Sequence, residues 1–259
     1  MFKKYHCKFL SMALVLMLTM AALSFANGQE QKTEPAEMFY YVASKVKIEI
    51  YDGDNLARTQ DLGTEELWVG EKEIADVSGE RILYLNTEKN QLILIDLKNR
   101  TYVTTQLPVK LENIYSKEKL LKLQKQKRTG VVKPLKKTRE IMGLKCKAYQ
   151  FTTKTTKENG TGEQNVITAW ASTKVPFDLK KYDQLLECLR VISNRDKKER
   201  RQLEKIKGLQ LRIEGFLNQE GKRQKYISEV VEISKKVPPV SSIDELISAQ
   251  GLTRIERFK

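Results

Sequence analysis

Acidic side chains are the main candidates for chemistry in this sequence, because its one histidine, His6, lies close to the start of the chain. Serine and cysteine triads and most zinc sites depend on histidine. Glu65 and Glu66 are neighbours in a predicted strand and point to opposite faces, so they cannot act on one bond. Asp183 and Glu187 share one helix face, away from the leucine stripe, which favours a solvated surface over an acid/base pair. We therefore expect no enzyme, no metal site and no cofactor.

The first residues, 1–26, have the layout of a secretory signal peptide. A lysine-containing start precedes an uncharged apolar run over residues 9–25, and the small residue Ala26 follows it. This run is shorter than the roughly 20 residues that a membrane-spanning helix needs. We expect cleavage after Ala26, a flexible leader over residues 27–37 and a single domain over residues 38–259, located in the periplasm or secreted.

The chain is strongly basic, with a formal net charge of +14. Three lysines leave with the signal peptide, and the remaining 44 basic and 33 acidic residues give +11. An exported basic protein meets anionic lipids, glycans or acidic proteins, so we expect no nucleic acid partner.

Ten basic residues and a single acid lie between Lys117 and Arg139. We call these ten the basic segment: Lys117, Lys119, Lys122, Lys125, Lys127, Arg128, Lys133, Lys136, Lys137 and Arg139. The segment is a candidate for docking on an anionic membrane surface or an envelope protein, and a solubilising face is the alternative.

Strand patterns dominate the chain. Residues 139–177 read as three antiparallel strands, with Met142 and Gly143 at a tight turn and Cys146 on an alternating apolar face. Further strands are expected at residues 42–51, 63–69, 81–86, 91–97, 101–105, 209–218 and 222–234. The two strands 81–86 and 91–97 are apolar on both faces, which predicts covering layers on both sides of the sheet. The expected class is mainly β (α+β), with an antiparallel sheet.

Three helices are expected. The first covers residues 116–127, is capped by Ser116 and ends at Gly130. The second, residues 178–193, has an apolar stripe, and its charged continuation is interpreted as a solvated helix face. The third covers residues 243–249. The stripe of the second helix consists of Tyr182, Leu185, Leu186, Leu189 and Ile192.

Two cysteines remain after cleavage, Cys146 in a strand and Cys188 in the second helix. An even count in an oxidising compartment allows one disulfide between them, and buried free thiols fit the pattern equally well.

Four stretches of the chain resemble one family of exported bacterial proteins. They are REIMGLKCKAYQF, NVITAWASTKVPFD, KGLQLRIE and EVVEISKKVPP. Together they resemble an uncharacterised family that has the fold of the outer-membrane lipoprotein carrier LolA, over roughly residues 40–240. Gln210 stands where that family has proline, and the tail after Ser242 lacks the family's aromatic ending.

The resemblance implies an incomplete antiparallel barrel, a half-barrel of about ten strands, with helices packed on its concave face. In the carriers, the space between sheet and helices takes up acyl chains. By this likeness we expect the chain to bind a lipid or an acylated peptide, and an envelope interaction protein is the alternative. The cavity wall is expected to include the strand residues Trp68, Tyr84, Ile93, Tyr149 and Trp170.

Overall fold

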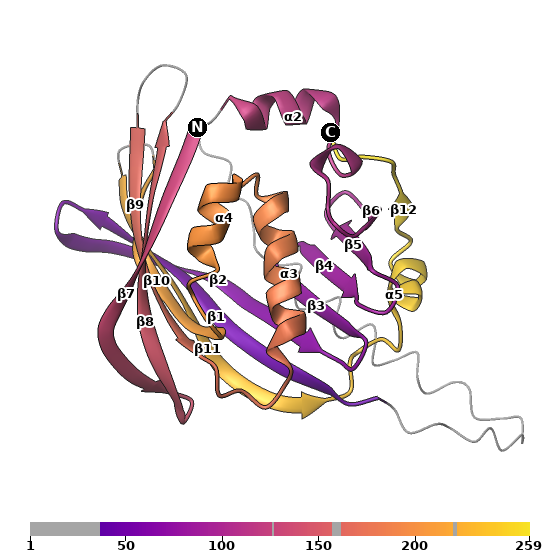
Figure 1. Cartoon of the computed structure of the whole chain (residues 1–259), viewed down its shortest axis with the longest axis horizontal. Coiled ribbons are helices and arrows are strands. Elements are labelled where there is room, and N and C mark those ends of the chain that lie inside the picture. The colour runs from indigo at the N-terminus through magenta and orange to yellow at the C-terminus, as the bar shows by residue number, and fades with distance from the viewer. Residues whose placement is uncertain (1–36, 126, 157–161, 220–221) are drawn as a thin grey trace, which may run out of the picture. The chain divides into compact units, whose positions relative to one another are not determined.

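The computed structural model describes residues 37–125, 127–156, 162–219 and 222–259 (Figure 1). The predicted signal peptide and all but the last residue of the predicted leader lie outside these ranges. The described part is mainly β, with one open antiparallel sheet of 12 strands and four α-helices. The strands are β1 (Phe39–Asp52), β2 (Asn55–Val69), β3 (Glu73–Ser78), β4 (Arg81–Asn86), β5 (Gln91–Asp96), β6 (Thr101–Gln106), β7 (Lys127–Ile141), β8 (Leu144–Thr156), β9 (Gly162–Ser172), β10 (Leu209–Gln219), β11 (Lys222–Lys236) and β12 (Thr253–Arg254). The helices are the 3-10 turn η1 (Leu111–Asn113), α2 (Lys117–Gln124), α3 (Leu179–Ile192), α4 (Lys197–Leu203) and α5 (Ile243–Ala249).

Two meanders share the sheet, whose strand order is β12-β6-β5-β4-β3-β2-β1-β11-β10-β9-β8-β7. Strands β1 to β6 form one meander and β7 to β11 the other, and antiparallel pairing of β1 with β11 joins them. All pairs are antiparallel except the short β12, which runs parallel to β6. The sheet does not close, so β7 and β12 are its edges.

The predicted hairpin at Met142 and Gly143 is confirmed. Ile141 pairs with Leu144, and both turn residues have positive φ, 54° for Met142 and 73° for Gly143. Two successive positive φ angles are typical of the type I′ turn, whose twist matches that of the flanking strands. This turn fixes the register of β7 against β8.

Helix α3 packs on one face of the sheet, as its stripe predicts. Asp178 caps its N-terminus by accepting a hydrogen bond from the Lys180 amide. Tyr182, Leu185 and Cys188 are buried in the main core cluster together with strand residues from both meanders. Figure 1 shows the sheet curving around α3 and α4. We call the face toward α3 the helix face of the sheet.

Helix α5 covers the opposite face over β4 and β5. Ile243 and Leu246 pack there against a separate cluster made by Ile82, Tyr84, Ile93 and Ile95. The neighbouring residues Leu83, Leu85 and Leu92 instead belong to the core cluster under α3. The expectation that strands apolar on both faces are covered on both sides is thus confirmed.

Several predicted boundaries are wrong. The first helix ends at Gln124, and Gly130 lies inside β7. A Cβ atom at Gly130 would lie 2.7 Å from the Phe151 ring and 2.8 Å from Cγ of Glu199, so this glycine allows α4 to approach β7 closely. The strands β3 and β12 were not expected, because β3 has only six residues with Asp76 among them and β12 has only two. They account for the difference between about ten strands and 12.

The alternating charges predict that α4 is a solvated helix face, and this prediction is wrong for Glu199. Asn194, with φ of 53°, breaks the chain after α3, and Glu199 of α4 is 1 % exposed. Arg195 donates a hydrogen bond to Oε1 of Glu199, and Nε of Arg128 in β7 lies 3.2 Å from the same oxygen. A buried charge is tolerated only when it is paired. We call Glu199 with its two arginines, Arg128 and Arg195, the Glu199 clamp. Through Arg128 it links α4 to the edge strand β7.

Glu199→Gln should lower the free energy of unfolding by about 3 kcal/mol, because two arginines would lose their buried counter-charge. Urea unfolding followed by circular dichroism measures this change. Glu204→Gln, an exposed position at the end of the same helix, is the matched control and should stay within about 0.5 kcal/mol of the unchanged protein. Equal stability of the two variants would show that the clamp does not hold α4 in place.

Candidate functional site

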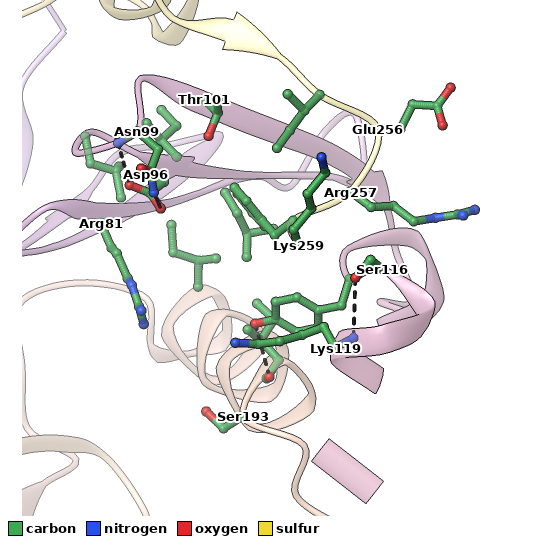
Figure 2. Close-up of a pocket in the computed structure, with 18 of the residues that line it drawn as sticks. Arg81, Asp96, Asn99, Thr101, Ser116, Lys119, Ser193, Glu256, Arg257 and Lys259 are labelled. Atoms are coloured by element: carbon green, nitrogen blue, oxygen red, sulfur yellow. Dashed lines mark hydrogen bonds between the residues drawn. The ribbon is translucent and has the colours of Figure 1, made fainter. Parts of the chain in front are cut away.

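A large cavity lies between the helix face of the sheet and α3 (Figure 2), with a volume of about 1190 Å³. Strands β3 to β6 supply its floor, and the last turns of α3 supply one wall. The start of α2 and the C-terminal tail, residues 255–259, supply the other walls. The four elements come from sequence positions far apart, so only the folded chain assembles this cavity.

Apolar side chains make up part of the lining of this cavity, beside polar and charged ones. Leu83 and Leu94 lie opposite each other on β4 and β5, on the helix face of the sheet. The remaining apolar lining residues from α3 and the tail are Leu189, Ile192, Ile255 and Phe258. Ile82 and Ile95 also border the cavity, but they pack in the cluster under α5 on the opposite face. The apolar part of the lining suits a hydrocarbon chain, because ligand cavities are lined mainly by apolar side chains with a few placed polar groups.

Basic side chains outnumber acidic ones in the lining of this cavity. The cationic lining residues are Arg81, Lys117, Lys119, Arg257 and Lys259, and the acidic ones are Asp76, Asp96 and Glu256. In Figure 2, Arg81 extends from β4 into the space beside α3, whereas Glu256 and Arg257 point outward. Burial raises the pKa of Asp96, but hydrogen bonds from Asn99 and the charge of Arg81 lower it below its usual value overall.

The C-terminal tail and α2 close the cavity through backbone contacts. The amide of Ser116 donates to the carbonyl of Phe258 at 2.8 Å, and the amide of Phe258 donates to the carbonyl of Ile114 at 2.7 Å. Tyr115 donates its hydroxyl to the carbonyl of Ile192 at the end of α3, over 3.5 Å. The start of α2 is therefore fixed to both the tail and α3.

A smaller cavity of about 170 Å³ lies further toward the start of α3 and shares Asp76 and Leu189 with the large one. Its lining includes the carboxylate of Glu65, which accepts a hydrogen bond from the Ser78 hydroxyl at 3.1 Å. Burial, and then the charge of Glu65, raise the pKa of Asp76 to about 6. Burial and Glu65 also raise the pKa of Tyr226 to about 12. The charged residues of the small cavity are thus all acidic, whereas those of the large cavity are mostly basic.

The five predicted wall residues are dispersed. Trp68 lies on the face away from α3, where its ring contacts Tyr41 at 4.5 Å between centroids. Tyr84 and Ile93 pack under α5. Tyr149 belongs to the cluster beneath α4, and Trp170 packs against the main core. All five are in the described part of the chain, and none of them lines either cavity.

The alternation of side chains along a strand explains why Tyr84 and Ile93 do not line the cavity. Tyr84 and Ile93 are direct neighbours of Leu83 and Leu94, which do line the cavity. Successive side chains point to opposite faces of a sheet. When a strand is apolar on both faces, its sequence does not indicate which face lines the cavity. The cavity residues from α2 and the tail were also missed, because no local pattern connects positions 115–119 with 255–259.

The basic segment is divided between two elements. Lys117, Lys119, Lys122 and Lys125 belong to α2 and its C-cap, and the other six lie in the edge strand β7. Arg128 contacts the buried Glu199, and Lys133, Lys136, Lys137 and Arg139 of β7 are exposed. Lysines, Pro134 and an irregular register after it are features that keep an edge strand from pairing with another sheet.

The remaining candidates can also be located. Cys146 and Cys188, the cysteines of the described part, are both buried free thiols in the main cluster. Glu66 accepts hydrogen bonds from Tyr41 and Trp68 on the face away from α3, so it lies opposite Glu65. Glu187 pairs with Arg190 and Arg200. Within the described residues, no three His, Cys, Asp or Glu side chains are grouped as metal ligands.

Replacing Asp76 tests whether its pKa is raised in the folded protein. Burial raises the pKa of Asp76 to about 6 in the folded state, above the 3.8 of an exposed aspartate, so the folded state takes up this proton first as the pH falls. As the pH falls from about 6 to about 4, protonation of Asp76 should therefore raise the free energy of unfolding by about 3 kcal/mol. Asp76→Asn should be more stable than the unchanged protein at pH 7.5, and the difference should vanish near pH 4.

Urea unfolding at several pH values measures this effect. Asp183→Asn, at an exposed position of α3, is the control and should leave the pH dependence unchanged. A stability difference between Asp76→Asn and the unchanged protein that does not vary with pH would contradict the raised pKa.

Comparisons with known proteins give no relative. No family model matches the chain, and no curated protein matches it either. Among the helices of the described residues, none is long and apolar enough to cross a membrane.

Proposed function

We propose that this protein is an exported, non-catalytic binding module that holds a lipid or an acylated peptide between its sheet and α3. The observation that carries this proposal is the cavity of about 1190 Å³, which is lined in part by apolar side chains and by more basic than acidic ones. Pockets for small ligands are typically about 300–1,000 Å³ and mostly apolar, so this one has room for a bulky apolar ligand. The compartment is the periplasm or the extracellular space.

We further propose that the open sheet is a half-barrel of the LolA kind. Support comes from the single antiparallel sheet with α3 and α4 against one face, around which the sheet curves (Figure 1). A half-barrel leaves its helix face open to a ligand along the gap between sheet and helix. The large cavity lies in that gap.

The charges give the ligand an orientation. Glu65 and Asp76 in the small cavity repel an anionic group, and Arg81 in the large cavity attracts one. Charge-assisted hydrogen bonds to a guanidinium are stronger than neutral ones. The apolar part of the ligand therefore lies toward α3 and the sheet, and an anionic head group lies beside Arg81.

Native mass spectrometry of protein purified from its own compartment without detergent tests the proposal. We expect a bound acyl species at close to one per chain, which solvent extraction and lipid analysis would identify. A bare mass, with no gain in thermal stability from added fatty acids or lysophospholipids, would refute the binding function.

A variant that fills the rim gives a sharper form of this test. Ser193 is exposed and lines the cavity at the end of α3 (Figure 2), so Ser193→Trp should reduce the bound acyl species by at least about tenfold. Ser248→Trp, at an exposed position of α5, is the matched control and should retain the ligand. Retention of ligand by both variants would place the ligand elsewhere.

A second candidate function is an envelope interaction protein that binds an anionic surface or a protein partner. The exposed basic residues of β7 favour it. If it holds, replacing Lys133, Lys136 and Lys137 by glutamine should release the protein from the envelope fraction, while the bound acyl species stays absent in all forms. An unchanged distribution between soluble and envelope fractions would exclude β7 as the contact surface.

A further inference from the structure

Helix α2 is exposed to an unusual degree for a helix that carries leucines. Among the residues of Lys117–Gln124, all of which the structure describes, none is buried, and Leu121 is 53 % exposed. Helices of globular proteins normally bury an apolar stripe against a core. The apolar side of α2 is thus only partly used inside the protein.

Hydrogen bonds rather than apolar packing hold this helix. Ser116 caps its N-terminus by accepting from the Lys119 amide at 3.3 Å. At its other end, Nδ2 of Asn194 donates to the carbonyl of Leu123 at 2.9 Å. Figure 1 shows α2 at the end of the sheet, apart from its strands. The outward side of α2 is therefore available to a partner.

The outward side combines one leucine with lysines. Lys117, Leu121 and Lys125 follow each other at a spacing of four, so they form one row along the helix, and all three are exposed. Lys119 and Lys122 are exposed as well, and Glu118 is the single acid of the helix. An exposed apolar side chain flanked by lysines is typical of helices that lie in the interface of an anionic membrane.

We propose that α2 docks the protein on an anionic lipid surface, with Leu121 inserted among the acyl chains and its lysines at the head groups. Lys117 and Lys119 also line the large cavity, so docking brings the cavity rim to the membrane. The inference deepens the proposed function and rests on it for one point, namely that the docked surface is the source or the acceptor of the bound lipid.

Flotation with lipid vesicles tests the docking. The full mature chain is mixed with vesicles of equal parts phosphatidylglycerol and phosphatidylcholine, and with pure phosphatidylcholine vesicles as the uncharged reference. Lys117→Gln combined with Lys125→Gln should weaken binding on the order of 30-fold, since each lysine near an anionic surface is worth about fivefold. Leu121→Asp should weaken it on the order of tenfold, because the apolar contact is lost.

The matched control replaces the same number of charges elsewhere. Lys136→Gln combined with Lys137→Gln, on the exposed part of β7, should change binding by less than about threefold. Thermal unfolding of each variant shows that the fold is kept, as expected for exposed positions. Binding that depends on the β7 pair and not on Leu121 would overturn the proposal in favour of the strand surface.

The two proposals can fail separately. An unchanged chain that ignores the anionic vesicles but carries an acyl species in native mass spectrometry would overturn the docking and keep the binding function. A chain that binds the vesicles through Leu121 and has a bare mass would support the docking and remove the binding function.

Discussion

The pairing of β1 with β11 is the contact on which the rest of the structure depends. It joins residues near the start of the described chain to residues almost 200 positions later, from Phe39 opposite Lys236 to Tyr51 opposite Arg223. Without it, the two meanders would be separate small sheets, each with too little area to bury α3. With it, Val42 and Val230 lie in one core cluster with Tyr182 and Leu185 of the helix.

The long pairing also determines where the cavities lie. The small cavity is lined by β1, β2, β3, β10 and β11 on the sheet side, so it spans the junction of the two meanders. The large cavity continues from it over β3 to β6. Since β6 ends the meander, its outer edge is left for the C-terminal tail, which pairs there through β12 and then turns to contact Ser116. The cavity walls thus follow from the sheet order.

Local signals in the sequence were sufficient for much of this fold. The turn at Met142 and Gly143, the cap at Asp178 and the limits of α5 follow from residues that lie next to one another. The site was not predictable in the same way. Whether Leu83 or Tyr84 lines the cavity depends on the face of the sheet that α3 covers, and α3 is about 100 positions further along the chain.

Charged residues show the same limit. The alternating charges of α4 look solvated in sequence, yet Glu199 is buried because Arg128 and Arg195 converge on it. Similarly, the ten residues of the basic segment form one run in the sequence, but the chain divides them between a helix at the cavity rim and an edge strand. A run of like charges in the sequence shows only the local composition. The role of each charged residue depends on the helix or strand in which it lies.

The cost of the buried acid Asp76 bears on the proposed function. A carboxylate whose pKa is raised to about 6 by burial destabilises the folded state at neutral pH. An apolar residue at that position would remove the cost, so stability alone does not account for an aspartate there. Perturbed carboxylates cluster at functional sites. Under the proposed function, the place of Asp76 where the two cavities meet has a specific effect: its charge opposes an anionic group in the small cavity and favours a head group beside Arg81 and the lysines of α2.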